Sequence, residues 1–526
     1  MITVLLLFTV FFLLLFQLIK KSLWSQLAIP EVRGLPIIGN LLPVVLKKKT
    51  YFEIIENIYK LGEGKDYIGF YNGTQPTLLI RNPDLVEIMF KEEANRGRGV
   101  SFSDAPPCHE HRKTPKTLQL GCRPSLSIMQ ARTWSTPTIT PGSRTRWPAL
   151  EEEIRLFRHQ PITWFSPYSP TAEPGRESGL EDVTAAAKTS YLLVAYMFYF
   201  ARLKTVFDGI ESCTVECQNS FGSSVDIKEA MDQHTCNVIA KTVFCVQDNT
   251  GFVENSHKAF SLSGLSGIAV LLRIFIPHFA LSVGIKTVPQ ESEAFYRNAI
   301  SRSTRVPGSF LDLMLSLKET EPDFSDDLMV AQFFIFILAG FETTSTALTY
   351  ALYLLSKNPE VQIKARLEAQ NVFKEHGKSM DSLKKLTYLE CIINETLRLF
   401  PPVTGMFRLA EKPFKLPCGT ILPAGSGVSV SLYDLHRDPR FYKDPLNFIP
   451  ERWEEPQKVF YPFGLGPRLC IGMKFALLEM KIFLSSVILN YNIKLNSATV
   501  EPLSFDPTSF MYKTINPILL DFEKNV

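Results

Sequence analysis

The sequence predicts a mainly α-helical protein with a small β-rich portion, preceded by one N-terminal transmembrane helix. This fold class depends on three observations: an apolar N-terminus, helical periodicity that dominates from Ala201 onward, and strand-like patterns confined to short stretches. A chain of 526 residues is long enough to bury a large core.

Composition argues against several classes of function. The formal net charge is only +3, so there is no strong electrostatic case for nucleic acid as the main partner. The 9 cysteines are scattered singly, and an odd number without regular spacing fits a reduced, cytosol-facing domain better than a disulfide scaffold. Cys470 has no paired cysteines of the kind that hold zinc or iron–sulfur clusters, which argues against both.

The stretch from Met1 to Ile19 carries no charge and consists largely of Leu, Phe, Val and Ile. As a helix it would be about 28 Å long, close to the hydrocarbon thickness of a bilayer. Lys20 and Lys21 follow directly, and the positive-inside rule then keeps the rest of the chain cytosolic. A cleaved signal peptide is the alternative, but it would need a basic segment before the apolar stretch and a small-residue cleavage site after it. We therefore expect a membrane anchor over residues 1–19.

Between the anchor and the main domain we expect a connector over residues 20–45. It begins with the two lysines, and Pro30 to Pro43 is rich in Pro and Gly, as in a stiff spacer. The main domain is expected over residues 46–526. Its first elements are an amphipathic helix over Tyr51–Leu61 and a hairpin with strands at Tyr67–Tyr71 and Thr77–Ile80, joined at Asn72-Gly73.

The clearest helical pattern runs from about Asp326 to Ser356 and stops before Asn358-Pro359, where proline disfavours a helix. It is apolar nearly all round in Phe333–Leu338, which predicts a central, buried helix. The later patterns predict amphipathic helices over Pro359–His376 and Leu386–Phe400, a strand-and-turn section over Leu416–Val430, and a helix from Met473 onward.

The segment that carries chemistry is the glycine-rich stretch from Phe463 to Gly472, FGLGPRLCIG. A thiolate bound to iron must be shielded from water and must receive partial positive charge. Gly464 and Gly466 permit a tight turn with backbone N–H groups aimed at the sulfur of Cys470, and the following helix points its N-terminal dipole there. Taken alone, a Gly-x-Arg-x-Cys string is usually a turn with a buried structural cysteine.

Here the full string F-x-x-G-x-R-x-C-x-G is present, and it resembles the haem-binding loop of the cytochrome P-450 family. The resemblance implies that Cys470 ligates the iron of haem b (iron protoporphyrin IX) and that Arg468 pairs with a haem propionate. It implies that the rest of the cofactor-binding loop includes Phe463, Gly466 and Gly472.

The stretch from Ala339 to Thr344 (AGFETT), in the long buried helix, resembles the family's oxygen-activation segment. By that resemblance Gly340 leaves room over the haem, and Glu342 and Thr343 are the catalytic pair that relays protons to dioxygen. Taken alone, Thr343 is more often a hydroxyl bonded to the preceding helical turn. Further along, Arg408 follows Pro401-Pro402-Val403 and resembles a second partner for a haem propionate.

Glu395 and Arg398 lie three residues apart on one helix face, which by itself is a surface ion pair worth under about 1 kcal/mol in most proteins. Downstream, the stretch Pro450 to Trp453 (PERW) resembles the family segment whose arginine joins that pair. The resemblance therefore implies a buried structural triad of Glu395, Arg398 and Arg452. Trp453 stands where the family usually has Phe.

Together the motifs most resemble insect microsomal detoxification members of the family, with the haem between the Thr343 helix and the Cys470 loop. The resemblance implies a monooxygenase that inserts one oxygen atom into a lipophilic small molecule, xenobiotic or endogenous, with electrons from NADPH. Because no G-x-G-x-x-G fingerprint is evident, the electrons would come from a separate flavoprotein reductase in the same endoplasmic reticulum membrane. Candidate docking charges are Lys458, Lys474 and Lys481.

Residues 97–200 do not fit this interpretation. Proline is unusually frequent between Ser101 and Gly179, and sustained helical periodicity is missing. No tryptophan there has an arginine four residues later, as the family's propionate-binding helix would require. Either the segment is aberrant coding sequence or it is a genuine divergent insertion. An aberrant segment would make the protein a catalytically impaired haem-binding membrane protein. A haem isomerase without external electrons is a further alternative, against which the acid–alcohol pair argues.

Overall fold

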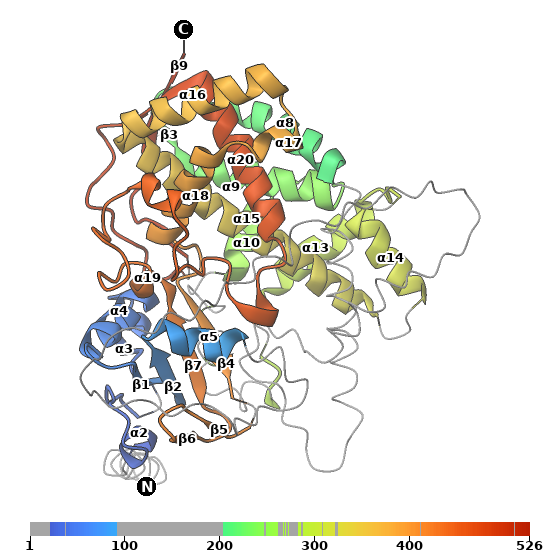
Figure 1. The fold of residues 1–526 in the computed structure, drawn as a ribbon. Coiled ribbons are helices and arrows are strands. Elements are labelled where there is room, and N and C mark those ends of the chain that lie inside the picture. Colours follow the sequence, from blue (N-terminus) through green and yellow to red (C-terminus); the bar gives the residue numbers. More distant parts are fainter. Residues whose placement is uncertain are drawn as a thin grey trace, which may run out of the picture.

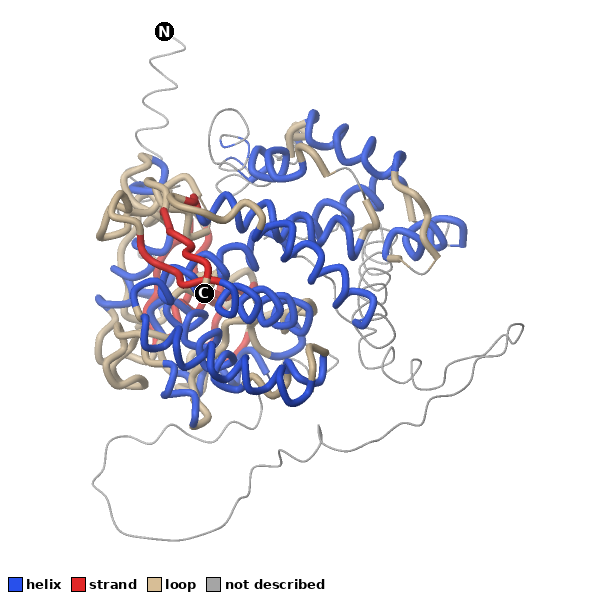
Figure 2. The backbone as a smooth tube through the Cα atoms, turned by 90° about the horizontal axis from the view of Figure 1, so that it is seen from above, coloured by secondary structure: helices blue, strands red, loops and turns tan. Residues whose placement is uncertain are grey.

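The computed structural model describes residues 22–36, 38–91, 203–246, 249–260, 282–285, 288–307, 309–320, 324–410, 412–509 and 511–525, with single residues at 267, 269 and 272. The predicted anchor over residues 1–19 and the atypical segment over residues 97–200 lie outside the described residues. The described part is mainly helical with small sheets, as the sequence predicts. Figure 1 shows the helices gathered around α15 and α20, with the largest sheet below them, and Figure 2 shows strands grouped toward one side of the helical body.

The largest sheet joins strands from the N-terminal part of the described chain to strands more than 300 residues later. Its four strands lie in the order β1-β2-β7-β4, with bounds Tyr67–Asn72, Gln75–Ile80, Gly427–Ser431 and Gly405–Leu409. Strands β1 and β2 form the predicted antiparallel hairpin, and Gly73 in its turn has a φ of 65°, which favours glycine. Strands β2 and β7 pair in parallel, so residues near the N-terminus share a sheet with the segment that follows Arg408.

Two smaller sheets complete the β-rich portion. One contains β3 (Val225–Asp226), β9 (Leu519–Lys524) and β8 (Tyr491–Leu495), in that order. The other pairs β5 (Phe414–Lys415) with β6 (Ile421–Leu422).

The predicted helices are confirmed to within a few residues at each end. Those expected from periodicity are α4 (Tyr51–Leu61), α15 (Asp326–Lys357), α16 (Pro359–His376), α18 (Thr387–Leu399) and α20 (Met473–Asn490). The other α-helices of the described chain are α2 (Leu23–Gln26), α3 (Leu42–Val45), α5 (Pro83–Lys91), α8 (Leu203–Gln218), α9 (Ile227–Val238), α10 (Phe252–Phe260), α13 (Gln290–Arg302), α14 (Phe310–Thr320), α17 (Met380–Leu383) and α19 (Leu432–Leu435). Short helical turns of other types are η2 (Ile239–Val243), η3 (Pro450–Glu454) and η4 (Gly466–Arg468).

Helix α15 is the central helix that the apolar pattern predicts. Ser325 caps it by accepting a hydrogen bond from Leu328 N–H, and Asn358 ends it before Pro359. Its core face includes Phe333, which is fully buried. Among the described residues α15 is the one helix long and apolar enough to cross a membrane, and its packing against α9, α13, α18 and α20 accounts for that composition.

The connector predicted for residues 20–45 needs correction from residue 22 onward, because this stretch packs on the domain. Trp24 is fully buried, and its indole Nε1 donates a hydrogen bond to the Phe70 carbonyl at 3.1 Å. Gly69 N–H donates to the Pro30 carbonyl at 2.7 Å, and Val32 N–H to the Gly69 carbonyl at 2.8 Å. Backbone pairing with β1 therefore fixes the Pro- and Gly-rich stretch on the sheet, and the predicted boundary at residue 46 falls inside the packed body.

Asp434 is an unusual buried acid at the end of this sheet. It lies in the short helix α19, where Ser431 Oγ caps its backbone N–H at 3.2 Å and also hydrogen bonds its carboxylate. Burial raises the pKa of Asp434 from 3.8 to about 7. The folded protein therefore holds this proton more tightly than the unfolded chain does, and stability falls as pH rises from about 4 to about 7.

We predict that Asp434→Asn flattens this pH dependence and makes the protein more stable than the parent at pH 8. Each pH unit between the two pKa values contributes at most about 1.4 kcal/mol, and the asparagine side chain can still accept from Ser431. The measurement is the urea midpoint of parent and variant from pH 5 to pH 8, with exposed Asp84→Asn as the matched control. Parallel curves for the parent and Asp434→Asn would contradict the assignment.

Candidate active site

The loop before Cys470 folds back on itself through glycines in the left-handed region. Gly464 has a φ of 84° and Gly466 a φ of 74°, conformations that strain other residues. The Cys470 N–H donates a hydrogen bond to the Phe463 carbonyl at 2.8 Å, which closes the loop. The partly buried Phe463 ring packs against the main hydrophobic core. The loop thus holds Cys470 directly ahead of helix α20.

The Cys470 thiol lies at the N-terminus of α20, as the sequence predicts. Burial raises the pKa of this thiol, and backbone N–H groups of Gly472 and Met473 offset part of the rise by hydrogen bonding to the sulfur. The donors come from the helix start, whereas the sequence pointed to the turn around Gly464. A Cβ added to Gly472 would lie 3.9 Å from the Cys470 sulfur, an ordinary van der Waals contact, so Gly472 lies directly beside the sulfur.

This donor set fits a haem iron. The sulfur has two backbone donors at a helix N-terminus, and a bound iron ion would supply the further positive charge that a buried thiolate needs. Among the described residues Cys470 belongs to no group of three or more possible metal ligands, and its sulfur is the atom that would hold the iron of a bound haem.

The two arginines predicted to pair with haem propionates lie on different elements. Arg408 is on strand β4, where its Nη1 donates to the Phe407 carbonyl at 2.9 Å and its guanidinium lies 4.9 Å from the centre of the Phe90 ring. Arg468 belongs to the turn η4, two residues before Cys470. Their pairing with propionates remains a prediction.

The predicted acid–alcohol pair lies on α15, and its two side chains have different partners. Thr343 Oγ1 donates to the Ala339 carbonyl at 2.7 Å, the back-bond to the preceding turn that is usual for a helix hydroxyl. The buried Glu342 carboxylate accepts from Lys228 Nζ at 3.2 Å and lies 3.1 Å from His257 Nε2. The sequence did not reveal Lys228 and His257, because helices α9 and α10 that carry them are distant in sequence.

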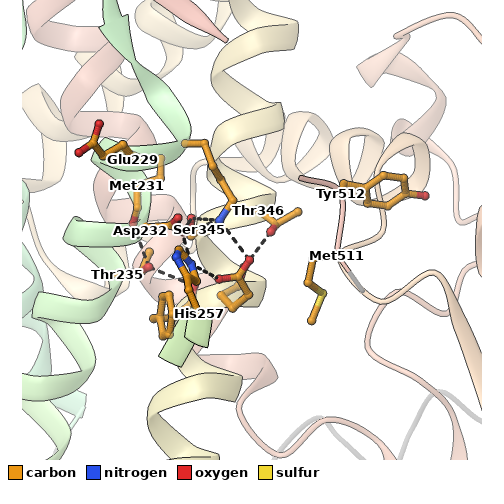
Figure 3. Close-up of polar contacts among 12 residues, drawn as sticks. Glu229, Met231, Asp232, Thr235, His257, Ser345, Thr346, Met511 and Tyr512 are labelled. Atoms are coloured by element: carbon orange, nitrogen blue, oxygen red, sulfur yellow. Dashed lines mark hydrogen bonds and ion pairs between the residues drawn. The ribbon is translucent and has the colours of Figure 1, made fainter. Parts of the chain in front are cut away.

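Figure 3 shows this side of α15, with Asp232, His257 and Ser345 close to one another. Burial alone would raise the pKa of Glu342, but Lys228 and His257 outweigh it and lower the pKa to about 2. Two residues earlier, a Cβ on Gly340 would meet Ile239 Cδ1 at 2.5 Å. Gly340 therefore lets α15 pack closely against the Ile239 side chain of η2, a role that the sequence did not indicate.

Glu395, Arg398 and Arg452 come together in the structure. The Glu395 carboxylate accepts two hydrogen bonds of 2.8 Å from Arg398, and both side chains have no solvent exposure. Arg452 Nε donates to the same carboxylate at 2.9 Å. This interaction ties α18 to η3.

Trp453 is a further member that the sequence missed. Its indole Nε1 donates to Glu395 Oε2 at 2.9 Å, so the tryptophan that stands where the family usually has Phe supplies an extra hydrogen bond to the buried carboxylate. The sequence did offer one indication of this contact, because tryptophan has an indole N–H donor that phenylalanine lacks.

A mainly helical fold with a cysteine thiol at a helix N-terminus, behind a glycine-bearing loop, is the arrangement expected of a haem-thiolate enzyme. Comparison with known proteins identifies the family. The family model described as Cytochrome P450 matches residues 204–520, so the chain belongs to the cytochrome P450 family. It is a monooxygenase, and its cofactor is haem.

The curated relatives cover nearly the whole chain. Cytochrome P450 6j1 of Blattella germanica is 27% identical over 96% of this chain and 93% of its own length. Cytochrome P450 6k1 of the same insect is 25% identical over 97% of this chain and 94% of its own length. Cytochrome P450 3A7 of Homo sapiens is 28% identical over 95% of this chain and 92% of its own length. The chain is thus similar to insect members of the family, as the sequence motifs indicated.

We predict that Glu395→Gln destabilises the protein by about 3–5 kcal/mol, because it leaves buried guanidinium groups without a counter-charge. Trp453→Phe should cost less, about 1–3 kcal/mol, since it removes one hydrogen bond to a charged group and keeps an aromatic ring. Urea midpoints and the yield of folded protein measure both effects.

The matched control is Asp381→Asn, which breaks another pair with the same spacing. Asp381 and Lys384 are 2.8 Å apart, but their side chains are 88% and 74% exposed, so little change is expected. Equal midpoints for Glu395→Gln and Asp381→Asn would show that the buried carboxylate is not a stabilising centre.

Proposed function

We propose that this monooxygenase inserts one oxygen atom from dioxygen into a lipophilic small molecule, xenobiotic or endogenous, with electrons from NADPH delivered by a separate flavoprotein reductase. The observation that carries the proposal is the Cys470 thiol at the start of α20, behind a loop closed by its own N–H bond to Phe463. When bound, the haem supplies the oxygen-activating chemistry, which a thiolate ligand favours.

The side chains divide the work around this cofactor. Cys470 holds the iron, while Phe463, Gly466 and Gly472 shape the loop around it. Arg408 and Arg468 neutralise the propionates, because guanidinium groups pair well with carboxylates. Glu342 and Thr343 supply protons as oxygen is reduced.

The reductase docks on the face that carries the Cys470 loop, through exposed basic side chains. Lys458 suits this role, because its side chain is 79% exposed and its pair with Asp84 is a loose 3.4 Å. Lys474, at the start of α20, is the second candidate. Lys481 suits it less, since its side chain is only 12% exposed and its Nζ is held 2.7 Å from Glu390.

The protein works on the cytosolic side of the endoplasmic reticulum membrane, held by the apolar segment over residues 1–19. Its length matches a bilayer, and Lys20 and Lys21 favour a cytosolic body. The domain follows with hardly any free spacer, since residues from Ser22 onward pack on the sheet. A short tether of this kind keeps the β-rich portion near the membrane surface.

A second candidate is a haem-binding membrane protein that does not turn over because residues 97–200 are aberrant. The family match begins only at residue 204, directly after this segment. The missing Trp-x-x-x-Arg pair would leave one propionate with fewer partners. Reductase-dependent product formation distinguishes this candidate from the first.

We predict that Cys470→Ala abolishes the thiolate-type spectrum of the reduced, carbon monoxide-treated protein. Alanine has no sulfur to bind iron, whereas Cys391→Ala on α18 should keep the spectrum. The measurement is that spectrum for parent, variant and control in isolated membranes. Retention of the spectrum in Cys470→Ala would refute the proposed ligand. A parent that shows the spectrum but makes no product with reductase and NADPH, across a broad panel of lipophilic compounds, would favour the impaired form.

We predict that deletion of residues 1–19 moves most of the protein from the membrane pellet to the soluble fraction, because the main apolar attachment is lost. The full chain in sealed microsomes should be open to added protease, as a cytosolic body requires. Exchanging Lys47 and Lys48 for Gln, with residues 1–19 intact, is the control and should leave the protein in the pellet. A full chain that resists protease until detergent is added would refute the orientation.

A further inference from the structure

A cluster of charged and polar side chains, among them Asp232, His257 and Ser345, lies between α9, α10 and α15 (Figure 3). Lys228 and Asp232 come from α9, His257 from α10, and Glu342 and Ser345 from α15. His257 Nε2 lies 3.1 Å from Glu342 Oε2 and 3.5 Å from Asp232 Oδ2. One imidazole therefore contacts both carboxylates.

The ammonium of Lys228 occupies the other side of the two carboxylates. It donates to Glu342 Oε1 and to Ser345 Oγ, each at 3.2 Å, and it forms an ion pair with Asp232. Asp232, His257 and Glu342 have the side-chain types and spacing of a metal site. The charge that a metal ion would bring is already supplied by Lys228, so the cluster is better suited to holding protons.

The cluster has one more carboxylate than ammonium groups, so one exchangeable proton would balance its charge. Two carboxylates face one ammonium, and a buried group without a balancing charge is costly. Burial raises the pKa of Asp232, whereas Lys228 and His257 overcome burial at Glu342 and lower its pKa. The two carboxyl groups thus have different proton affinities within one hydrogen-bonded network, an arrangement typical of proton-transfer sites.

His257 is the member of the cluster that reaches water. Its side chain is 38% exposed, against 14% for Lys228, 12% for Glu342 and 6% for Asp232. Histidine is also the side chain that gains and loses a proton near neutral pH. Of the other titratable groups around α10, Tyr296 of α13 is hydrogen bonded to Ser256, and Glu254 pairs with Lys258 at the surface.

We propose that His257 is the proton-entry residue of this active site, which takes protons from solvent and passes them to Glu342. Lys228 and Asp232 are positioning residues that keep His257 and Glu342 within hydrogen-bonding distance of each other. In the transfer, the imidazolium form of His257 loses its Nε2 proton as an O–H bond forms at Glu342 Oε2, which leaves a neutral imidazole. The imidazole then takes up a new proton from solvent, and Glu342 returns to the carboxylate when it passes its proton on. A carboxylate that holds a proton weakly passes it on readily toward Thr343. The inference rests on the proposed monooxygenase function, because that reaction consumes protons.

The test compares His257→Gln, whose amide can still donate to Glu342 but cannot transfer a proton, with Lys258→Gln, its exposed neighbour. In membranes with reductase and NADPH, His257→Gln should raise the share of electrons lost as peroxide and slow proton-dependent turnover about tenfold or more. It should also enlarge the solvent deuterium isotope effect. Lys258→Gln should behave as the parent does.

A second measurement does not depend on turnover. Infrared difference spectra of the purified protein across pH 5–8 should show a carboxyl band that Asp232→Asn removes and His257→Gln shifts. An unchanged band together with unchanged peroxide loss in His257→Gln would overturn the inference and leave the proposed function intact. A parent without the thiolate spectrum would instead overturn the proposed function, and the infrared comparison would still decide the role of His257.

Discussion

The buried carboxylate of Glu395 is the interaction on which the cysteine side of the molecule depends. It accepts hydrogen bonds from Arg398, Arg452, Trp453 and the Ile449 N–H, at 2.8–3.0 Å. A carboxylate without solvent exposure is costly unless hydrogen-bond donors replace the lost water. The Glu395 side chain is fully buried, and both of its oxygens accept hydrogen bonds from these donors. The donors come from helix α18 and from the segment around η3, so the carboxylate fixes where the chain runs before it reaches the cysteine loop.

From this centre a series of hydrogen bonds leads to the loop that precedes Cys470. Arg398 Nη1 donates to the His436 carbonyl at 2.8 Å, and the Tyr461 N–H donates to His436 Nε2 at 3.0 Å. Burial and the nearby arginines lower the pKa of His436 to about 3, so its ring is neutral and can accept that bond. The Tyr461 carbonyl in turn accepts from the Gly464 N–H at 2.9 Å, in the loop that ends at Cys470. The buried ion pair therefore helps to fix the position of the Cys470 sulfur indirectly, through the intervening residues, although neither Glu395 nor Arg398 contacts the sulfur in these hydrogen bonds.

Local pattern explains what could be predicted from the sequence. The sequence predicts helix α15 because an apolar run ends at Asn358-Pro359, and it predicts the cysteine loop because the ten-residue stretch from Phe463 to Gly472 resembles the family's haem-binding loop. Contacts between distant segments left no such signal. The indole of Trp453 could not be assigned to Glu395, nor Lys228 to Glu342, because each pair is joined only by folding. The composition of the Pro- and Gly-rich stretch predicts a spacer. The sequence does not reveal that this stretch pairs with strand β1, which lies at the edge of the largest sheet.

Two buried charge networks in one fold differ in a way that suits different tasks. Around Glu395 the partners are guanidinium groups and an indole, and the remaining donors of Arg398 are taken by backbone carbonyls. Such a network is closed, because every donor of Arg398 has a fixed partner, and it therefore holds geometry constant. Around Glu342 the partners are a lysine and a partly exposed histidine, so this network is in contact with solvent. Under the proposed function, the network around Glu395 keeps the Cys470 loop in place, and the network around Glu342 belongs to the proton path inferred for His257.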